Sequence, residues 1–200
     1  MLRLYNSQLS GNCYKVRLLL TLLEIPFERI EVDVVDRSNR LELLGGKNPA
    51  LRVPTLELED GTHLAESNAI LWYFAEGTRY LPEDRLERAR VLQWMFFEQY
   101  DVEPNLAVAR FWISILGQAE RYAEALAAKW KAGYRALDGM ERHLEDRVFL
   151  VGDRYSIADI ALYAYVHVAD EAGFDLGPYP ATREWLARVA GRPGHVPMPA

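Results

Sequence analysis

Residues 2–34 read LRLYNSQLSGNCYKVRLLLTLLEIPFERIEVDV. Leu2 to Tyr5 has a strand-like composition, and apolar residues from Tyr14 to Leu20 have the spacing of a helix face. Pro26 predicts the end of this helix, because proline has no N–H to donate within a helix. Arg29 to Val34 alternates with a period of two, which predicts a half-buried strand. The chain is therefore expected to open as β-α-β.

The next segment predicts two further strands and a closing helix. A short helix is expected from Ser38 to Leu44, and Thr55 to Glu59 alternates like a strand. Asp60-Gly61 is a tight-hairpin signal, so His63 to Ala65 should pair antiparallel with the strand before it. A helix from Ser67 to Glu76 follows. This order predicts a four-stranded mixed sheet with helices on both faces, the α/β pattern of the thioredoxin fold.

The remainder of the chain lacks strand alternation and predicts an all-α helical bundle. We therefore expect a thioredoxin-like domain at 1–77, a linker at 78–84 and an all-helical domain at 85–200. The tail from Gly191, with three prolines, is predicted to be an extended strap or disordered. The helices expected in the second domain are Arg85 to Leu116, Ala119 to Glu145, Ser156 to Ala172 and Ala181 to Val189.

Composition excludes several classes of function. A net charge of -6 over 200 residues argues against a nucleic-acid partner. No apolar stretch approaches the roughly 20 residues needed to span a bilayer, and no signal peptide is recognised, so a cytoplasmic protein that does not bind membranes is expected. Cys13 is the single cysteine, which excludes an intramolecular disulfide, and the four histidines lack metal-ligand spacing. No metal site is expected.

Ser10-Gly11-Asn12-Cys13 lies between the first predicted strand and the first helix. Backbone N–H groups and the helix dipole favour an anion at such a position, and a thiolate would be stabilised there. Ser10 would supply a hydroxyl donor. The alternative is that Ser10 or Asn12 caps the helix and has no other role.

Four motifs together resemble the cytosolic glutathione transferase superfamily over essentially the whole chain. They are the Ser10 tetrad, Val53-Pro54-Thr55-Leu56, Glu66-Ser67 and Ser156-Ile157-Ala158-Asp159. The resemblance is to bacterial, serine-type members near the theta, beta and nu-like classes. It implies glutathione as co-substrate, a homodimer, and Ser10 as the catalytic donor to the glutathione sulfur. The Ser156 motif also fits a capping box, which is a structural role.

The resemblance also implies the residues that bind glutathione. A cis bond before Pro54 would turn the Val53 N–H and C=O toward the cysteinyl part of the tripeptide. Arg52 would meet the glycyl carboxylate, unless it is an ordinary exposed arginine. Glu66 and Ser67 would bind the γ-glutamyl ammonium and carboxylate, with a plain helix cap as the alternative for Ser67. Asn12 completes this set.

Two residues compete with Ser10 for the sulfur. Tyr5 lies near the end of the first strand, where tyrosine-type relatives carry their hydroxyl, although packing on the core is the commoner role. Cys13 is three residues after the position of a catalytic cysteine in the family, and a buried structural thiol is its commoner fate.

The second domain is expected to supply the pocket for an apolar electrophile. The candidates on the predicted Arg85 helix are Tyr100, Arg110, Phe111 and Trp112, although aromatic residues at helical spacing are more often part of a core. The reaction predicted from the sequence is glutathione conjugation. Glutathione-dependent disulfide or peroxide reduction, and a non-catalytic binding or interaction module, remain alternatives.

Overall fold

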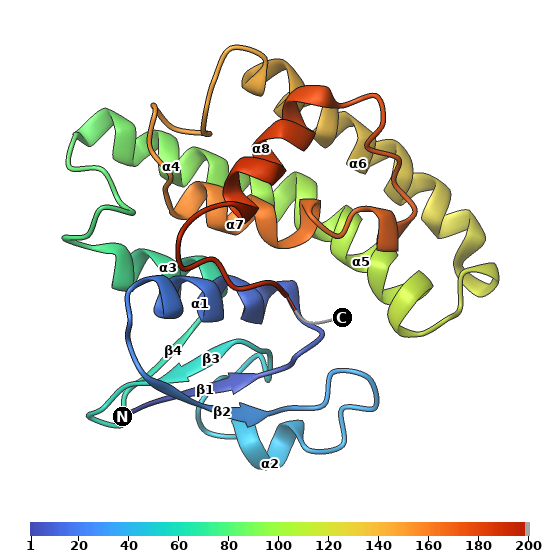
Figure 1. Ribbon diagram of the computed structural model, residues 1–200. Coiled ribbons are helices and arrows are strands. Elements are labelled where there is room, and N and C mark those ends of the chain that lie inside the picture. The colour runs from blue at the N-terminus through green and yellow to red at the C-terminus, as the bar shows by residue number, and fades with distance from the viewer. Residues whose placement is uncertain (199–200) are drawn as a thin grey trace. The chain divides into compact units, whose positions relative to one another are not determined.

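The computed structural model describes residues 1–198 (Figure 1). The chain forms two compact units, residues 79–192 and residues 1–78 together with the segment from Pro193. Among the described residues, no helix is long and apolar enough to cross a membrane. No group of three or more histidine, cysteine or acidic side chains in that part of the chain is arranged to hold a metal ion.

The first unit contains a four-stranded sheet with the order β2-β1-β3-β4. Its strands are β1 (Leu2–Asn6), β2 (Phe27–Glu31), β3 (Thr55–Glu57) and β4 (His63–Ala65). β1 pairs in parallel with β2 and antiparallel with β3, and β3 pairs antiparallel with β4. The predicted mixed sheet of a thioredoxin-like domain is confirmed, including the hairpin at Asp60-Gly61.

Helices cover both faces of this sheet, as the sequence predicts (Figure 1). Leu2 and Leu4 of β1 pack on one face with α1 (Gly11–Leu22) and α3 (Ser67–Ala75). Tyr5 packs on the opposite face, where α2 (Arg40–Leu44) contributes Leu44. Successive residues of a strand point to opposite faces, so the alternation within β1 supplies both cores.

Two strand ends differ from the prediction. β2 ends at Glu31 instead of Val34, because the Asp33 carboxylate accepts the N–H groups of Val35 and Asp36 at 2.7 and 2.9 Å and turns the chain. β3 ends at Glu57 instead of Glu59, since the Leu58 N–H already bonds the Thr62 carbonyl across the hairpin loop.

The second unit is helical throughout its regular structure. Its α-helices are α4 (Arg85–Phe97), α5 (Val108–Arg110), α6 (Ala123–Leu144), α7 (Ile157–Val166) and α8 (Pro180–Ala190). A π-helical segment, Glu98–Ala107, joins α4 to α5, and a second one, Phe111–Ile115, continues the helical run after α5. Pro104 lies inside the first segment, where its missing N–H removes a helical hydrogen bond. The predicted helix from Arg85 to Leu116 is therefore helical along its length but not regular.

The helix predicted from Ser156 to Ala172 is shorter than expected. α7 ends at Val166, and a separate 3-10 turn spans Asp170–Ala172. Gly173 ends that turn with φ of 79°, a conformation that glycine adopts readily. The prediction merged two elements because the sequence between them, from His167 to Ala169, contains neither proline nor glycine.

The capping box at the start of α7 is confirmed. Asp159 is fully buried, and its carboxylate accepts the Ser156 N–H at 2.9 Å and the Ser156 hydroxyl at 3.1 Å. The same carboxylate accepts the Leu150 N–H at 3.0 Å and the Trp185 indole N–H at 2.9 Å. Burial raises the pKa of Asp159, and these four hydrogen bonds oppose that shift. Asp159 thus ties together a loop, α7 and α8.

The C-terminal segment packs on the first unit as an extended strap, which is one of the two predicted outcomes. The Tyr14 hydroxyl on α1 donates to the Val196 carbonyl at 2.7 Å and lies 3.4 Å from His195 Nε2. A Cβ at Gly194 would lie 3.3 Å from Leu22 of the same helix. Pro199, the last of the predicted tail's three prolines, lies outside the described residues.

Candidate functional site

Ser10 is the N-cap of α1, and its hydroxyl oxygen accepts the Cys13 N–H at 3.2 Å. A hydroxyl has two acceptor lone pairs and one hydrogen, so capping uses a lone pair and leaves the O–H. The Ser10 side chain is half-exposed, and its hydroxyl also forms a hydrogen bond with the Cys13 sulfur that lowers the pKa of that thiol. Capping and donation to a sulfur are therefore compatible roles of one hydroxyl rather than alternatives.

Asn12 and Ser67 come together although they are 55 residues apart in sequence. The Ser67 hydroxyl donates to Asn12 Oδ1 at 3.2 Å, which places the N-terminus of α1 beside that of α3. Lys15, a fully buried residue of α1, donates from Nζ to Ser67 Oγ at 3.5 Å. Two helix N-termini and an ammonium group make this region favourable for a carboxylate.

Glu66 occupies the N-cap position of α3, so the helix begins at Ser67 itself. Ser67 is therefore not the helix cap that the sequence offered as its alternative role. Glu66 has φ of 67° and ψ of 114°, which is rare for a residue with a Cβ, and its exposed side chain makes no capping hydrogen bond. Such backbone conformations cost of order 1–3 kcal/mol and are concentrated at functional sites.

The bond between Val53 and Pro54 is cis, as the resemblance implies. The N–H and C=O of Val53 form no hydrogen bond with any residue in the described range. Arg52 is exposed, and its carbonyl accepts hydrogen bonds from Asn48 and Thr55 at 3.0 and 2.9 Å. The backbone before Val53 is thus fixed, while Val53 retains a donor and an acceptor for an added strand.

Tyr5 lies on the α2 face of the sheet and packs with Val32 and Leu44. Its hydroxyl donates to Glu57 Oε2 at 2.9 Å. Burial, followed by the hydrogen bond to Glu57, raises the pKa of Tyr5 to about 12. A hydroxyl committed to a carboxylate is poorly suited to donate to a thiolate, so the packing role of Tyr5 is favoured over the catalytic one.

Cys13 lies in the first turn of α1 and is fully buried. Its sulfur accepts the Ser7 N–H at 3.3 Å. Burial raises the pKa of the Cys13 thiol to about 11, so the thiol stays protonated at neutral pH. This environment is that of a structural thiol.

The four predicted electrophile residues do not share one environment. Tyr100 is 80% exposed, whereas Arg110 is buried and pairs with Glu171 at 2.6 Å. Trp112 stacks on Tyr122 with ring centroids 4.4 Å apart, and Phe111 is half-buried. Successive residues of a helix point in different directions around its axis, so positions 110, 111 and 112 cannot all face one pocket. Arg110 and Trp112 each have a structural partner within the helical unit.

Comparison with known proteins assigns a family. Residues 9–76 match the model of the glutathione S-transferase N-terminal domain, and residues 123–188 match that of the C-terminal domain. The chain belongs to the glutathione S-transferase family. One match lies in each structural unit, so the thioredoxin-like sheet and the helical unit both belong to the architecture of this family.

Solved glutathione transferases share this architecture over nearly the whole chain. A glutathione S-transferase from Pseudomonas fluorescens Pf-5 is 51% identical, with a TM-score of 0.96 and 98% of each chain covered. A second transferase family member from that species, solved with two glutathione bound, is 24% identical with a TM-score of 0.82 and shares the fold. The latter alignment covers 96% of this chain and 89% of that one.

Curated relatives within the family have different names. The chain is 30% identical to the disulfide-bond oxidoreductase YfcG of Escherichia coli, over 91% of this chain and 87% of that protein. It is 35% identical to elongation factor 1-gamma of Artemia salina over 70% of this chain. The match spans only 33% of the elongation factor. Family membership therefore does not by itself assign the reaction.

Two basic residues of α1 that lie next to the candidate site were not predicted from the sequence of this transferase-family chain. Lys15 and Arg17 are both buried, in a segment otherwise filled by Tyr14, Val16 and Leu18. Charged residues are rarely buried without partners. Two cations inside an apolar helical run were therefore the signal that could have identified them.

Proposed function

We propose that this chain is a glutathione transferase in which Ser10 donates a hydrogen bond to the thiolate of glutathione. The observation that carries the proposal is the half-exposed Ser10 hydroxyl at the helix N-terminus, which caps α1 through its oxygen and does not use its hydrogen for capping. A donor held at a helix N-terminus stabilises an anion in its place and lowers the pKa of a bound thiol.

The neighbouring residues fit the rest of the tripeptide. Val53 offers an N–H and a C=O to the cysteinyl backbone, and Arg52 offers an exposed guanidinium to the glycyl carboxylate. Asn12 and Ser67 lie at the two helix N-termini, where the γ-glutamyl carboxylate would bind, and Glu66 offers a carboxylate to its ammonium. Catalysis would then combine a lowered thiol pKa with proximity of the electrophile, without a covalent enzyme intermediate.

Measuring glutathione binding by variants of Glu66 and Ser67 tests the γ-glutamyl assignment without an activity assay. Glu66→Ala and Ser67→Ala should each weaken glutathione binding about 10-fold or more, because a hydrogen bond to a charged group contributes about 1.5–3 kcal/mol. Isothermal titration calorimetry measures the change. Glu42→Ala removes an exposed glutamate from α2 and should leave the affinity unchanged. Wild-type affinity in both site variants would refute the γ-glutamyl assignment.

Glutathione-dependent disulfide reduction is the second candidate, favoured by the similarity to YfcG. The buried, protonated Cys13 is unsuited to supply a thiol, so both electrons would come from glutathione. One glutathione thiolate would attack the substrate disulfide and release a thiol. A second thiolate would attack the mixed disulfide, giving glutathione disulfide and the second thiol. An assay with an aryl halide and with a small disulfide, in parallel, separates the two activities.

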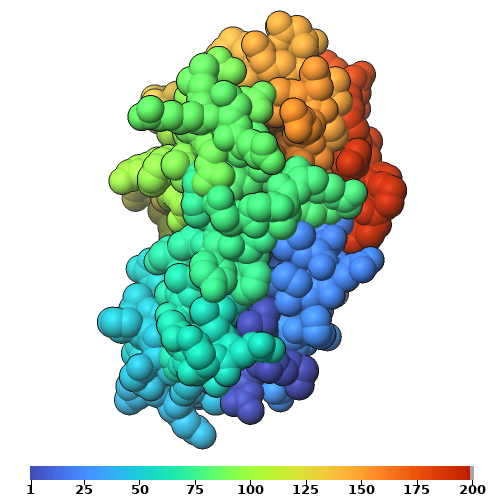
Figure 2. All heavy atoms as spheres, turned by 90° about the vertical axis from the view of Figure 1, so that its left-hand side faces the viewer, coloured from blue at the N-terminus to red at the C-terminus, as the bar shows by residue number. Residues whose placement is uncertain are grey.

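We also propose a homodimer that uses the outer face of α4. Leu92 and Phe96 are spaced by four residues and exposed, Phe96 at 61%, and Tyr100 continues the same spacing. Figure 2 shows α4 on the molecular surface, in green. An exposed apolar stripe of this kind is typical of a protein–protein interface.

Phe96→Glu should convert the dimer to a monomer, because the charge would be buried without a partner. Light scattering at micromolar concentration should give twice the chain mass for the wild type and the chain mass for the variant. Val148→Glu places the same charge at another exposed apolar residue of the helical unit and should remain dimeric. A monomeric wild-type protein would rule out the dimer.

A further inference from the structure

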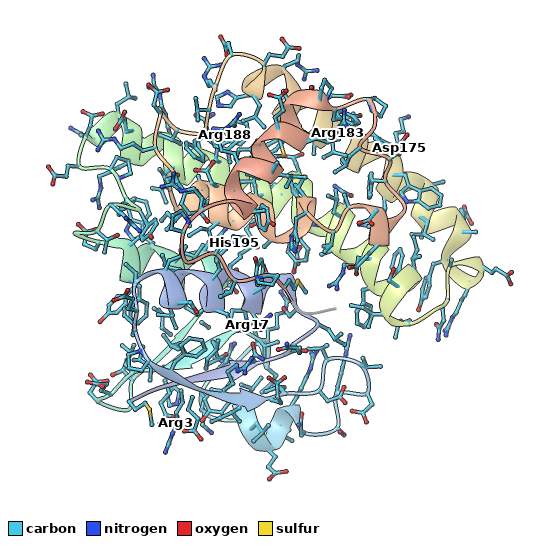
Figure 3. The ribbon with its side chains drawn as sticks, in the orientation of Figure 1. Arg3, Arg17, Asp175, Arg183, Arg188 and His195 are labelled. Atoms are coloured by element: carbon cyan, nitrogen blue, oxygen red, sulfur yellow. The ribbon has the colours of Figure 1, made fainter. Side chains whose placement is uncertain are left out.

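The loop between β1 and α1, which carries Ser10, is held by a hydrogen-bonded ring that the proposed chemistry has not used. Arg17 projects from α1, and Figure 3 labels it between that helix and the sheet. Its guanidinium is buried, and Nη1 donates to Asn6 Oδ1 at 2.5 Å and to the Ser7 carbonyl at 3.2 Å. Nη2 donates to the Gln8 carbonyl at 3.4 Å. One side chain therefore holds three consecutive residues, the last of β1 and the first two of the loop.

Glu31 at the end of β2 closes the ring from the other side. Its carboxylate accepts a hydrogen bond from the Asn6 side-chain amide through Oε1, and accepts the Gln8 N–H through Oε2 at 3.2 Å. The ring thus runs from Arg17 to Asn6, Glu31 and Gln8 and back to Arg17. The cation and the carboxylate balance each other through the Asn6 amide, which makes the burial of Arg17 tolerable.

The Ser7 carbonyl connects this ring directly to Ser10. It accepts the Ser10 N–H at 3.1 Å as well as the Arg17 guanidinium. The Ser7 N–H is fixed in turn by Cys13 Sγ. Both polar groups of the Ser7 backbone are therefore occupied, and the turn that presents Ser10 has no unpaired backbone group at this residue.

We propose that Arg17 is a positioning residue for Ser10, holding the Ser7 and Gln8 carbonyls so that the Ser10 hydroxyl stays where it meets the glutathione sulfur. The effect on catalysis rests on the proposed function. The hydrogen bonds from Arg17 to Asn6, Ser7 and Gln8, here called the Arg17 clamp, do not depend on that function. Misplacement of a catalytic group by about 1 Å can lower the rate about 100-fold. Without the Arg17 clamp, the Ser10 hydroxyl should therefore be a poorer hydrogen-bond donor to the glutathione sulfur.

The first arm of the test measures the loop and does not depend on glutathione. Amide hydrogen exchange, followed by NMR, reports the protection of the Gln8 and Ser10 N–H groups. Arg17→Met should raise both exchange rates at least about 10-fold, and Arg17→Lys should raise them less, since an ammonium reaches fewer of the three acceptors. Arg29→Met is the matched control, because the guanidinium of exposed Arg29 reaches this loop through a hydrogen bond to the Gln8 side chain, at 3.5 Å, and not through a loop carbonyl among the described residues.

The second arm measures the kinetic pKa of conjugation with an aryl halide. Arg17→Met should raise this pKa by about 0.5 to 1 unit and lower kcat/KM about 5- to 20-fold, with partial rescue in Arg17→Lys and no change in Arg29→Met. A merely structural role would lower the melting temperature and leave the pKa of the active enzyme in place. If Arg17→Met does not fold, Glu31→Ala at the exposed strand end should shift exchange and pKa in the same direction.

The outcomes separate the clamp from the proposed function. Unchanged loop exchange in Arg17→Lys and in Glu31→Ala would overturn the clamp whatever the enzyme does. Faster exchange with an unchanged kinetic pKa, while Ser10→Ala shifts that pKa, would overturn the positioning role alone. If Ser10→Ala itself leaves the profile in place, the serine mechanism fails, and the catalytic consequence drawn for Arg17 fails with it.

Discussion

Ser10→Ala is expected to lower kcat/KM for glutathione conjugation by about 10- to 1,000-fold, the range for removing one donor to a developing or bound anion. The kinetic pKa should rise, since the thiolate would lose its hydrogen-bond donor. The substitution also removes the N-cap of α1, which costs about 0.5–2 kcal/mol of stability. A thermal melt must therefore accompany the pH–rate profile.

Two further substitutions separate capping from donation. Ser10→Thr keeps both the capping oxygen and the O–H, and should recover stability and most of the turnover. Ser10→Asp keeps a capping oxygen but has no proton to donate when ionised, so it should be stable and inactive. A Ser10→Ala enzyme with wild-type turnover, or an active Ser10→Asp enzyme, would refute the donor role.

The rival residues provide the comparison. Tyr5→Phe and Cys13→Ala should have far smaller effects on the pH–rate profile, since the Tyr5 hydroxyl donates to Glu57 and the Cys13 thiol is buried. Cys13→Ala leaves the Ser7 N–H without its sulfur acceptor, so a modest loss of stability is expected with little change in the kinetic pKa. Loss of activity in Cys13→Ala with an unchanged Ser10→Ala profile would instead indicate a cysteine mechanism.

Asp159→Ala is expected to reduce the free energy of unfolding by about 3–5 kcal/mol, because the buried Leu150, Ser156 and Trp185 donors would lose their acceptor. The capping box alone would account for about 0.5–2 kcal/mol. The larger value follows from the contacts with the loop and with α8, which the sequence motif does not contain.

Chemical denaturation measures this loss, and Asp153→Ala gives the baseline. Asp153 is exposed in the loop before α7, so its removal should change stability by no more than about 0.5 kcal/mol. Glutathione binding by the folded fraction of Asp159→Ala should match the wild type. A loss below about 1 kcal/mol would mean that the Leu150 and Trp185 contacts contribute little.

The first unit was predictable because its signals are local. Alternation in β1 and in the Thr55 strand, the Asp60-Gly61 turn and Pro26 each determine structure within a few residues. One error in this unit occurs where a side chain ended a strand early. The Asp33 carboxylate turns the chain after β2, and an aspartate within an alternating run gives no sign of which backbone groups it will accept.

The candidate site was predictable only in part. Ser10, Glu66 and Ser67 could be proposed from the sequence because each lies at a junction between a strand and a helix. Arg17 and Glu31 were missed, since their ring forms between elements that only the fold brings together. The four electrophile candidates were chosen by residue type along one helix, and the π-helical segments alter the faces on which such residues lie.

The most direct test of the central claim is the pKa of the glutathione thiol in its complex with the protein. Titration of the ultraviolet thiolate absorbance, for the wild type and Ser10→Ala at saturating protein, measures it without turnover. The wild-type complex should titrate at least one unit below the value of about 8.5 for a free thiol, and Ser10→Ala should return toward that value. Identical titrations in the two complexes would contradict the assignment of Ser10 as the donor to the sulfur.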